Sequence, residues 1–155
     1  TMFNLENKKL ALASWIYLLI SEALNEINSE INVTVIKDGE KAIDYFDPSI
    51  DESEFPDFVL LDINIPKKNG HEVLEHIKSN DCFAHVPVII LTTSSSEKDI
   101  ARAYKNNVNC YVTKSVEVKD LFNTIFQIVN FWSKFAVSSK TKENSLKDWC
   151  NLWRW

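Results

Sequence analysis

Short apolar runs alternate with segments of helical periodicity along the chain. Residues 58–61 and 88–91 are each four consecutive apolar residues, which is typical of strands buried on both faces of a parallel sheet. In 31–36, β-branched and polar residues alternate, so this segment is also predicted to be a strand. Two shorter strands are predicted at 9–13 and 110–113.

A helical pattern follows each predicted strand, and five such units predict an α/β fold. The expected architecture is a doubly wound five-stranded parallel sheet with right-handed crossovers and helices on both faces. Helices are predicted at 15–27, at 40–46, after Gly70, after the hydroxyl-rich capping loop 92–96 and at 116–135. The last helix has an amphipathic face made of Val118, Leu121, Phe122, Ile125, Ile128, Val129 and Trp132.

The composition is that of an ordinary globular domain and excludes several functions. The chain has 155 residues, is 45% hydrophobic and carries a net charge of −5, which argues against a nucleic-acid partner. Gly39 and Gly70 are the only glycines, so a phosphate-binding loop built from several glycines is excluded. The spacing of His71 and His76 is wrong for a helical zinc site, and these two and His85 are expected at the surface.

Cysteine usage and hydropathy indicate a cytoplasmic protein that does not enter a membrane. Cys82, Cys110 and Cys150 are far apart and lack metal-ligand spacing, so reduced thiols are expected. The apolar run 10–20 superficially resembles a signal peptide, but it is too short to span a membrane. The acidic, polar stretch 47–56 is expected to be a surface loop.

Three chemically distinct side chains stand at the carboxyl ends of three predicted strands. Asp62 follows the third strand, Thr92 the fourth and Lys114 the fifth. Ligands bind at this edge of an open α/β sheet. A carboxylate that attacks phosphorus, with a hydroxyl and an ammonium to hold the new phosphoryl oxygens, is a phosphoryl-acceptor set. Each residue alone could be a helix cap, a loop residue or a solvated lysine, but together they favour this chemistry.

The chain resembles the receiver domains of two-component response regulators over about residues 8–132. It is most similar to the stand-alone receivers that serve bacterial phytochrome histidine kinases. The resemblance implies a flavodoxin-like sheet with strand order 2-1-3-4-5, and a single-domain regulator that accepts a phosphoryl group from a sensor histidine kinase rather than an enzyme. The stretches that carry the resemblance are 37–42, 60–74, 86–95, 109–114 and 131–132.

The resemblance also implies a role for each site residue. Asp62 would be the phosphoacceptor, and Thr92, Thr93 and Lys114 would bind the phosphoryl oxygens. Thr92 and Tyr111 would form the switch, in which Tyr111 turns inward as Thr92 moves toward the phosphoryl group. The added charge would thereby bias a two-state element of the fold.

The chain departs from the family pattern at its metal site. Asp62 and the backbone carbonyl of Asn64 would bind Mg²⁺, but the acidic pair expected at the end of the first strand is replaced by Leu12 and Ala13. No Asp or Glu occurs anywhere in 7–21, so a shift of register cannot restore the pair. Because Mg²⁺ needs oxygen ligands, usually one or two of them carboxylates, Asp62 alone would bind it weakly.

A second departure follows the lysine. Ser115 stands where the family usually has a proline, whose bond to the lysine is commonly cis. A cis bond before a residue other than proline costs about 3 kcal/mol, so a trans bond is expected between Lys114 and Ser115.

Two other functions compete with the phosphorelay receiver. The first is a pseudo-receiver, an interaction module that has lost metal-dependent phosphorylation, and Leu12, Ala13 and Ser115 favour it. The second is a flavin-binding protein of the same strand order. It would need a phosphate-binding loop after the first strand, where 13–15 offers one hydroxyl and no glycine.

The carboxyl-terminal segment is expected to lie outside the receiver domain, which is assigned to 1–137. Residues 138–144 are polar and are predicted to be a linker, and 145–155 are predicted to form a short amphipathic tail helix rich in tryptophan. The tail could pack on its own domain or contact a partner. A homodimer could form through it or through the face made of the fourth helix, fifth strand and fifth helix.

Overall fold

The protein contains a five-stranded parallel sheet with the order β2-β1-β3-β4-β5, which confirms the predicted fold class and strand order. The computed structural model describes residues 8–13, 17–27 and 31–136. Each predicted strand is present within one residue of its expected bounds. The strands are β1 (Lys8–Ala13), β2 (Ile31–Val35), β3 (Phe58–Leu61), β4 (Val88–Thr92) and β5 (Cys110–Thr113).

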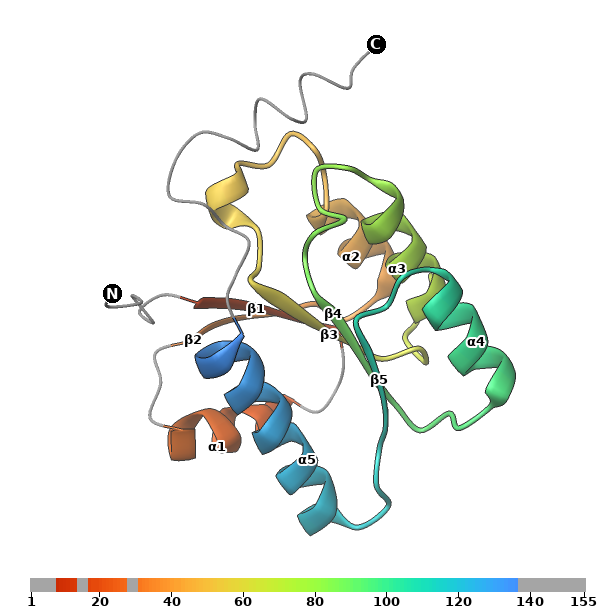
Figure 1. Ribbon diagram of the computed structural model, residues 1–155. Helices are drawn as coiled ribbons and strands as arrows, with labels where there is room; N and C mark the ends of the chain where they lie inside the picture. Colours follow the sequence, from red (N-terminus) through yellow and green to blue (C-terminus); the bar gives the residue numbers. More distant parts are fainter. Residues whose placement is uncertain (1–7, 14–16, 28–30, 137–155) are drawn as a thin grey trace.

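Helices cover both faces of the sheet. Helices α1 and α5 lie on one face, and α2, α3 and α4 lie on the other (Figure 1). Their bounds are α1 (Tyr17–Ile27), α2 (Gly39–Tyr45), α3 (Gly70–Ser79), α4 (Glu97–Lys105) and α5 (Val118–Asn130). A short 3₁₀ helix (Glu52–Glu54) precedes β3, and a π-helical segment (Phe131–Phe135) extends α5.

The central strands β3 and β4 are buried on both faces, as their unbroken apolar runs predict. Alternate residues therefore enter two separate cores. Phe58 and Leu60 pack with α1 and α5, whereas Val59 and Leu61 pack with α2 and α3. This double burial fixes the carboxyl ends of both strands, where the candidate site residues lie.

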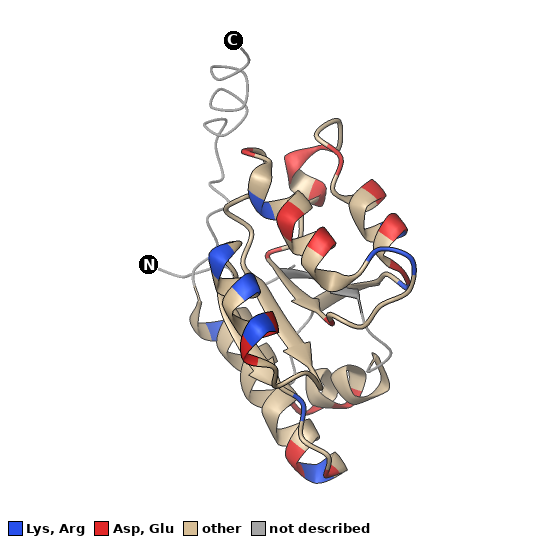
Figure 2. Ribbon diagram, turned by 90° about the vertical axis from the view of Figure 1, so that its right-hand side faces the viewer, with Lys and Arg blue, Asp and Glu red and all other residues tan. Residues whose placement is uncertain are grey.

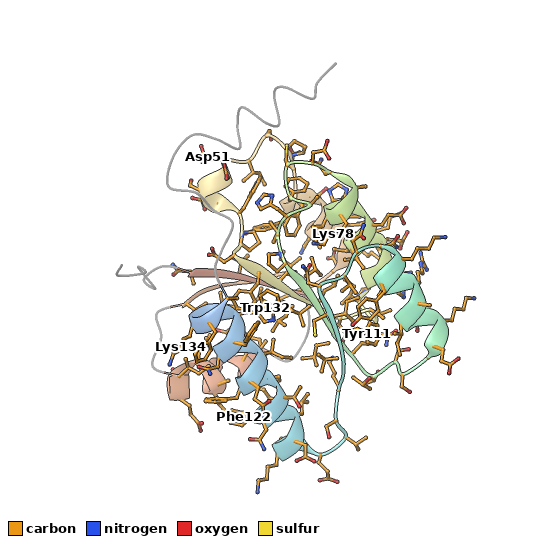
Figure 3. All side chains as sticks on the ribbon, viewed as in Figure 1. Asp51, Lys78, Tyr111, Phe122, Trp132 and Lys134 are labelled. Carbon is orange, nitrogen blue, oxygen red and sulfur yellow. The ribbon has the colours of Figure 1, made fainter. Side chains whose placement is uncertain are left out.

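Two details of the predicted pattern are wrong. The last helix begins at Val118 rather than at 116, so Val118 lies in its first turn and is 67% exposed instead of joining the apolar face. Phe122 and Trp132 do pack on the α1–α5 side of the sheet (Figure 3). The acidic stretch 47–56 is not wholly a surface loop, because the ring of Phe55 is buried against Phe83.

Charged residues lie mainly on helices and loops around the apolar sheet (Figure 2). Within the described ranges, no helix is long and apolar enough to cross a membrane. Cys82 and Cys110 are free thiols. Cys150, the predicted linker at 138–144 and the tail at 145–155 lie outside the described residues.

Lys78 connects the end of α3 to the edge of the sheet at which β4 and β5 begin. Its ammonium donates hydrogen bonds to the backbone carbonyls of Ala84 and Val86 at 3.0 and 2.8 Å, and to Oδ1 of Asn109 at 2.9 Å. The same Asn109 oxygen accepts a hydrogen bond from the backbone N–H of Val88 at 2.9 Å, so Asn109 links the starts of β4 and β5. Burial lowers the pKa of Lys78 to about 8.

We expect Lys78→Met to lower the free energy of unfolding at pH 7 by about 2 kcal/mol, because the three hydrogen bonds donated by the ammonium are lost. Since the folded pKa of Lys78 lies below that of a free lysine, the unfolded chain binds more protons between about pH 8 and 10.5. The advantage of the natural protein over the variant should therefore grow as pH rises through this window. Urea unfolding at several pH values measures both effects, with Lys98→Met, at an exposed position of α4, as control. A difference independent of pH would contradict the expected shift.

Candidate functional site

Three adjacent strand ends bring Asp62, Thr92 and Lys114 together, as the sequence predicted. Asp62 follows β3 directly, Thr92 ends β4 and Lys114 follows β5. The backbone N–H of Lys114 donates to the carbonyl of Thr92 at 2.6 Å, and its ammonium donates to Oδ2 of Asp62. The three residues are only 4%, 0% and 7% exposed, respectively. The carboxylate of Asp62 and the ammonium of Lys114 therefore meet at one buried point, and the buried Thr92 adjoins it through its backbone contact with Lys114.

The carboxylate of Asp62 is held at both oxygens. Lys114 donates to Oδ2, and the backbone N–H of Asn64 donates to Oδ1 at 3.0 Å. A buried carboxylate without such partners would be strongly destabilising, so loss of Lys114 alone would leave an uncompensated charge. The two contacts thus fix the orientation of the Asp62 carboxylate at the edge of the sheet.

Both glycines of the chain lie against the β3–α3 loop that follows Asp62. The N–H of Gly39, at the start of α2, donates to the carbonyl of Pro66 at 3.0 Å, and the N–H of Gly70, at the start of α3, donates to that of Ile63 at 2.9 Å. A Cβ on Gly39 would lie 1.8 Å from the carbonyl oxygen of Lys68, and one on Gly70 would lie 2.3 Å from that of Asp62. Only a residue without Cβ allows these loops to approach so closely.

The β3–α3 loop is also held by charge and capping. Lys67 adopts a left-handed backbone conformation with φ of 68°, and its ammonium lies 3.5 Å from Asp38 and 3.4 Å from Glu40. These carboxylates raise the pKa of Lys67. At the end of the loop, Asn69 and Glu72 form a reciprocal capping box that starts α3.

The described residues at this edge supply few ligands for a divalent metal ion. In the parallel register, Leu12 pairs with Leu60 and Ala13 with Leu61, so the end of β1 adjoins the strand end that carries Asp62 and brings no carboxylate to it. Among the described residues, no group of three His, Cys, Asp or Glu side chains could hold a metal ion. With Asp62 and the carbonyl of Asn64 as its expected protein ligands, Mg²⁺ would be held weakly, because it demands near-octahedral oxygen coordination.

The remaining predicted site residues surround the three central ones. Thr93 is exposed next to Thr92. Tyr111 is half-buried between β5 and α4 (Figure 3), and its hydroxyl donates to the backbone carbonyl of Ser94 at 2.8 Å. The peptide bond between Lys114 and Ser115 is trans as expected, since the described ranges contain no cis peptide.

A hydrogen-bonded cluster that the sequence pattern did not predict includes Ser94, the residue that contacts both Thr92 and Tyr111. His71, predicted at the surface, is 2% exposed, and its Nε2 lies 3.0 Å from Oδ1 of Asp99 on α4. Oδ2 of Asp99 accepts from the hydroxyl of Ser94 at 2.6 Å. His71 is buried because it lies three residues before Leu74 on the inner face of α3, and this i, i+3 spacing was the available signal.

The other two histidines also differ from the expected exposure, since His76 and His85 are both partly buried. His76 lies with Nε2 2.9 Å from the carbonyl oxygen of Phe46, and its ring stacks near Phe83. These contacts give His76 a structural role between α2 and α3.

Comparison with known proteins identifies the family. The response regulator receiver domain family matches residues 15–126, so the chain belongs to this family. The response regulator Rcp1 of Synechocystis is 39% identical over 116 residues, which cover 74% of this chain and 79% of that protein. The probable methanogenesis regulatory protein FilR2 of Methanothrix harundinacea is 37% identical over 118 residues, covering 74% of this chain and 75% of that protein.

A solved structure agrees with this assignment. The phosphorylated cyanobacterial phytochrome response regulator RcpA has a TM-score of 0.79 and 37% identity, over 86% of this chain and 99% of that one. The protein is therefore a receiver domain of two-component signalling. The family match begins after β1, the strand in which the acidic pair is missing.

The two glycines give a test in which helix propensity and steric fit predict opposite signs. Alanine is favoured over glycine within helices by about 1 kcal/mol, yet a Cβ at Gly39 or Gly70 would overlap backbone atoms. We expect Gly39→Ala and Gly70→Ala each to lower the free energy of unfolding by about 2 kcal/mol or more. Chemical denaturation measures this, with Asn123→Ala on the exposed side of α5 as a control that should stabilise slightly. Stabilisation by either glycine substitution would contradict the packing of these loops.

The missing acidic pair can be restored by substitution. We expect the natural protein to bind Mg²⁺ weakly, and the double variant Leu12→Glu with Ala13→Asp to bind it at least about tenfold more tightly, because carboxylates are added beside β3. Isothermal titration with MgCl₂ compares the two proteins. The same double substitution combined with Asp62→Asn should bind more weakly than the double variant. Equal affinities in the natural protein and the double variant would show that Mg²⁺ does not bind at this edge.

Proposed function

We propose that Asp62 is a phosphoacceptor that receives a phosphoryl group from a histidine of a sensor kinase. The observation that carries this proposal is the buried contact between Asp62, after β3, and Lys114, after β5, with Thr92 on the intervening strand β4. Membership of the receiver family supports the same role. The protein acts by stoichiometric modification, and any autophosphatase activity is incidental.

The chemical step requires few groups. A carboxylate oxygen of Asp62 attacks the phosphorus of the phosphohistidine and forms a P–O bond, while the P–N bond breaks and its electron pair returns to the imidazole. The ammonium of Lys114 changes its partner from the carboxylate to the new phosphoryl oxygens. The hydroxyls of Thr92 and Thr93 provide further donors at the end of β4.

Phosphorylation is transmitted through Thr92 and Tyr111. The hydroxyl oxygen of Thr92 accepts a hydrogen bond from the backbone N–H of Ser94 at 3.4 Å, and Tyr111 is bonded to the carbonyl of the same residue. When Thr92 turns toward the phosphoryl group, its bond to Ser94 is broken. The β4–α4 loop and the ring of Tyr111 then adjust together, which changes the α4–β5–α5 face.

The local chemistry supports phosphoryl acceptance with a reduced role for a divalent cation. The end of β1 supplies no carboxylate, and Lys114 already provides one positive charge at Asp62. The carboxylate of Asp62 and the carbonyl of Asn64 are the oxygens available to Mg²⁺, so the ion would be held loosely. Rcp1 has been solved in a Mn²⁺-bound form, which describes that relative.

The partner that the comparisons favour is a phytochrome-type histidine kinase. RcpA is named as a cyanobacterial phytochrome response regulator, and 37% identity over 86% of this chain supports a kinase of similar type. We place the protein in the cytoplasm, where such kinases present their phosphohistidine. The α4–β5–α5 face and the tail at 145–155 are the surfaces we assign to a homodimer, and we assign no nucleic-acid or membrane partner.

The proposal is tested by chemical phosphorylation. We expect incubation with acetyl phosphate to add one phosphoryl group by intact mass, and Asp62→Asn to abolish the gain because it removes the carboxylate that accepts from Lys114. Asp81→Asn, at an exposed carboxylate, is the matched control and should be modified normally. Replacement of MgCl₂ by EDTA should slow the reaction only a few-fold. A protein that gains no phosphoryl group at high Mg²⁺ would be an interaction module, and the proposal would be wrong.

A further inference from the structure

Ser94 is the point at which both proposed switch residues are attached. Its backbone N–H donates to the hydroxyl oxygen of Thr92 at 3.4 Å, and its carbonyl accepts from the hydroxyl of Tyr111 at 2.8 Å. Ser94 belongs to the β4–α4 loop, which has no ladder partner to fix it. Whatever holds Ser94 therefore also sets the positions of Thr92 and Tyr111.

The side chain of Ser94 is held from outside the β4–β5 pair. Its hydroxyl donates to Oδ2 of Asp99 at 2.6 Å, and Oδ1 of Asp99 accepts from Nε2–H of His71 at 3.0 Å. The carboxylate acceptor requires that Nε2 carries the hydrogen. These bonds from Ser94 and His71 lower the pKa of Asp99, so it is ionised at neutral pH. The chain of contacts runs from α3 through α4 to the loop.

A histidine at position 71 is expected to destabilise the fold relative to an apolar residue, so its contact with Asp99 is the feature that would justify it. The side chain is 2% exposed, and its Nδ1 is buried without a hydrogen-bond partner among the described residues. A buried polar atom that lacks a partner costs about 1–3 kcal/mol, whereas an apolar side chain on this inner face of α3 would cost nothing of the kind. The neighbouring inward residues Val73, Leu74 and Ile77 are all apolar.

We propose that His71 and Asp99 are positioning residues that hold Ser94 and thereby keep Tyr111 in its half-buried position against α4. This inference rests on the proposed function only for its signalling consequence, since the contacts exist in the unmodified protein. With the anchor in place, Tyr111 is kept inward before any phosphoryl group arrives. The anchor thus sets how much of the conformational change remains for phosphorylation to drive.

The experiment uses the unmodified full chain labelled with 3-fluorotyrosine and observed by fluorine NMR. The chain contains four tyrosines, and Tyr111→Phe assigns the signal of interest. We expect one dominant Tyr111 signal in the natural protein. His71→Leu removes the donor and keeps the bulk, so a second Tyr111 signal should increase about tenfold in population, as the loss of a hydrogen bond to a charged group predicts.

Two further variants separate positioning from simple damage to the core. His71→Gln presents an amide N–H where Nε2–H was, and we expect it to restore the natural spectrum to within about twofold. Ser94→Ala breaks the chain at the loop without touching the core and should reproduce the effect of His71→Leu. Glu75→Gln, at an exposed position of α3, is the control and should change nothing.

The Tyr111 signals of the unmodified variants test the positioning role without any phosphorylation. An unchanged Tyr111 signal in both His71→Leu and Ser94→Ala would overturn it, as would a glutamine variant that behaves like the leucine variant. Acetyl phosphate is added only in a second step, to measure how far the same signal moves. If no phosphoryl group is gained in this second step, the proposed function is wrong. The NMR comparison of the unmodified variants still tests the positioning role of His71 and Asp99.

Discussion

The buried ion pair between Asp62 and Lys114 is the interaction on which the site depends. It links β3 to β5 across the carboxyl end of β4, so three strands must be in register before the two side chains can meet. Charges this deeply buried are tolerated only in well-fixed geometry. The double burial of β3 and β4 supplies that geometry, and the close approach of the loops at Gly39 and Gly70 limits movement around it. The carboxylate of Asp62 is thus positioned by the whole core rather than by its own loop.

The same pair explains how the site can exist without the acidic residues typical of its family. In a cluster of carboxylates, mutual repulsion is relieved by a bound cation or by protonation of one member. Here Leu12 and Ala13 replace those carboxylates, so Asp62 faces one ammonium and no like charge from β1. The charges of Asp62 and Lys114 therefore balance each other. This balance, rather than the identity of any single residue, distinguishes the site from that of a metal-loaded receiver.

Most of the fold and the three central site residues could be predicted because each leaves a periodic or positional signal. The unbroken apolar runs located β3 and β4, and the ends of β3, β4 and β5 then located Asp62, Thr92 and Lys114. The contact between His71 and Asp99 could not be predicted from such a signal. Asp99 lies 28 residues away in the sequence, and only the packing of α3 against α4 brings the two side chains together. Phe55 was missed for a similar reason, since a single aromatic residue in an acidic stretch has no periodicity.

The scarcity of glycine has a consequence for the unfolded chain. A protein of average composition and this length would contain about 11 glycines, whereas this one has two, both required by steric contact. Each glycine gives the denatured backbone extra freedom that folding must remove, equivalent to about 0.5–1 kcal/mol relative to alanine. With that freedom confined to Gly39 and Gly70, the disordered ensemble is comparatively stiff. Part of the stability of this receiver therefore comes from the reduced conformational freedom of the unfolded chain, and not from contacts in the folded one.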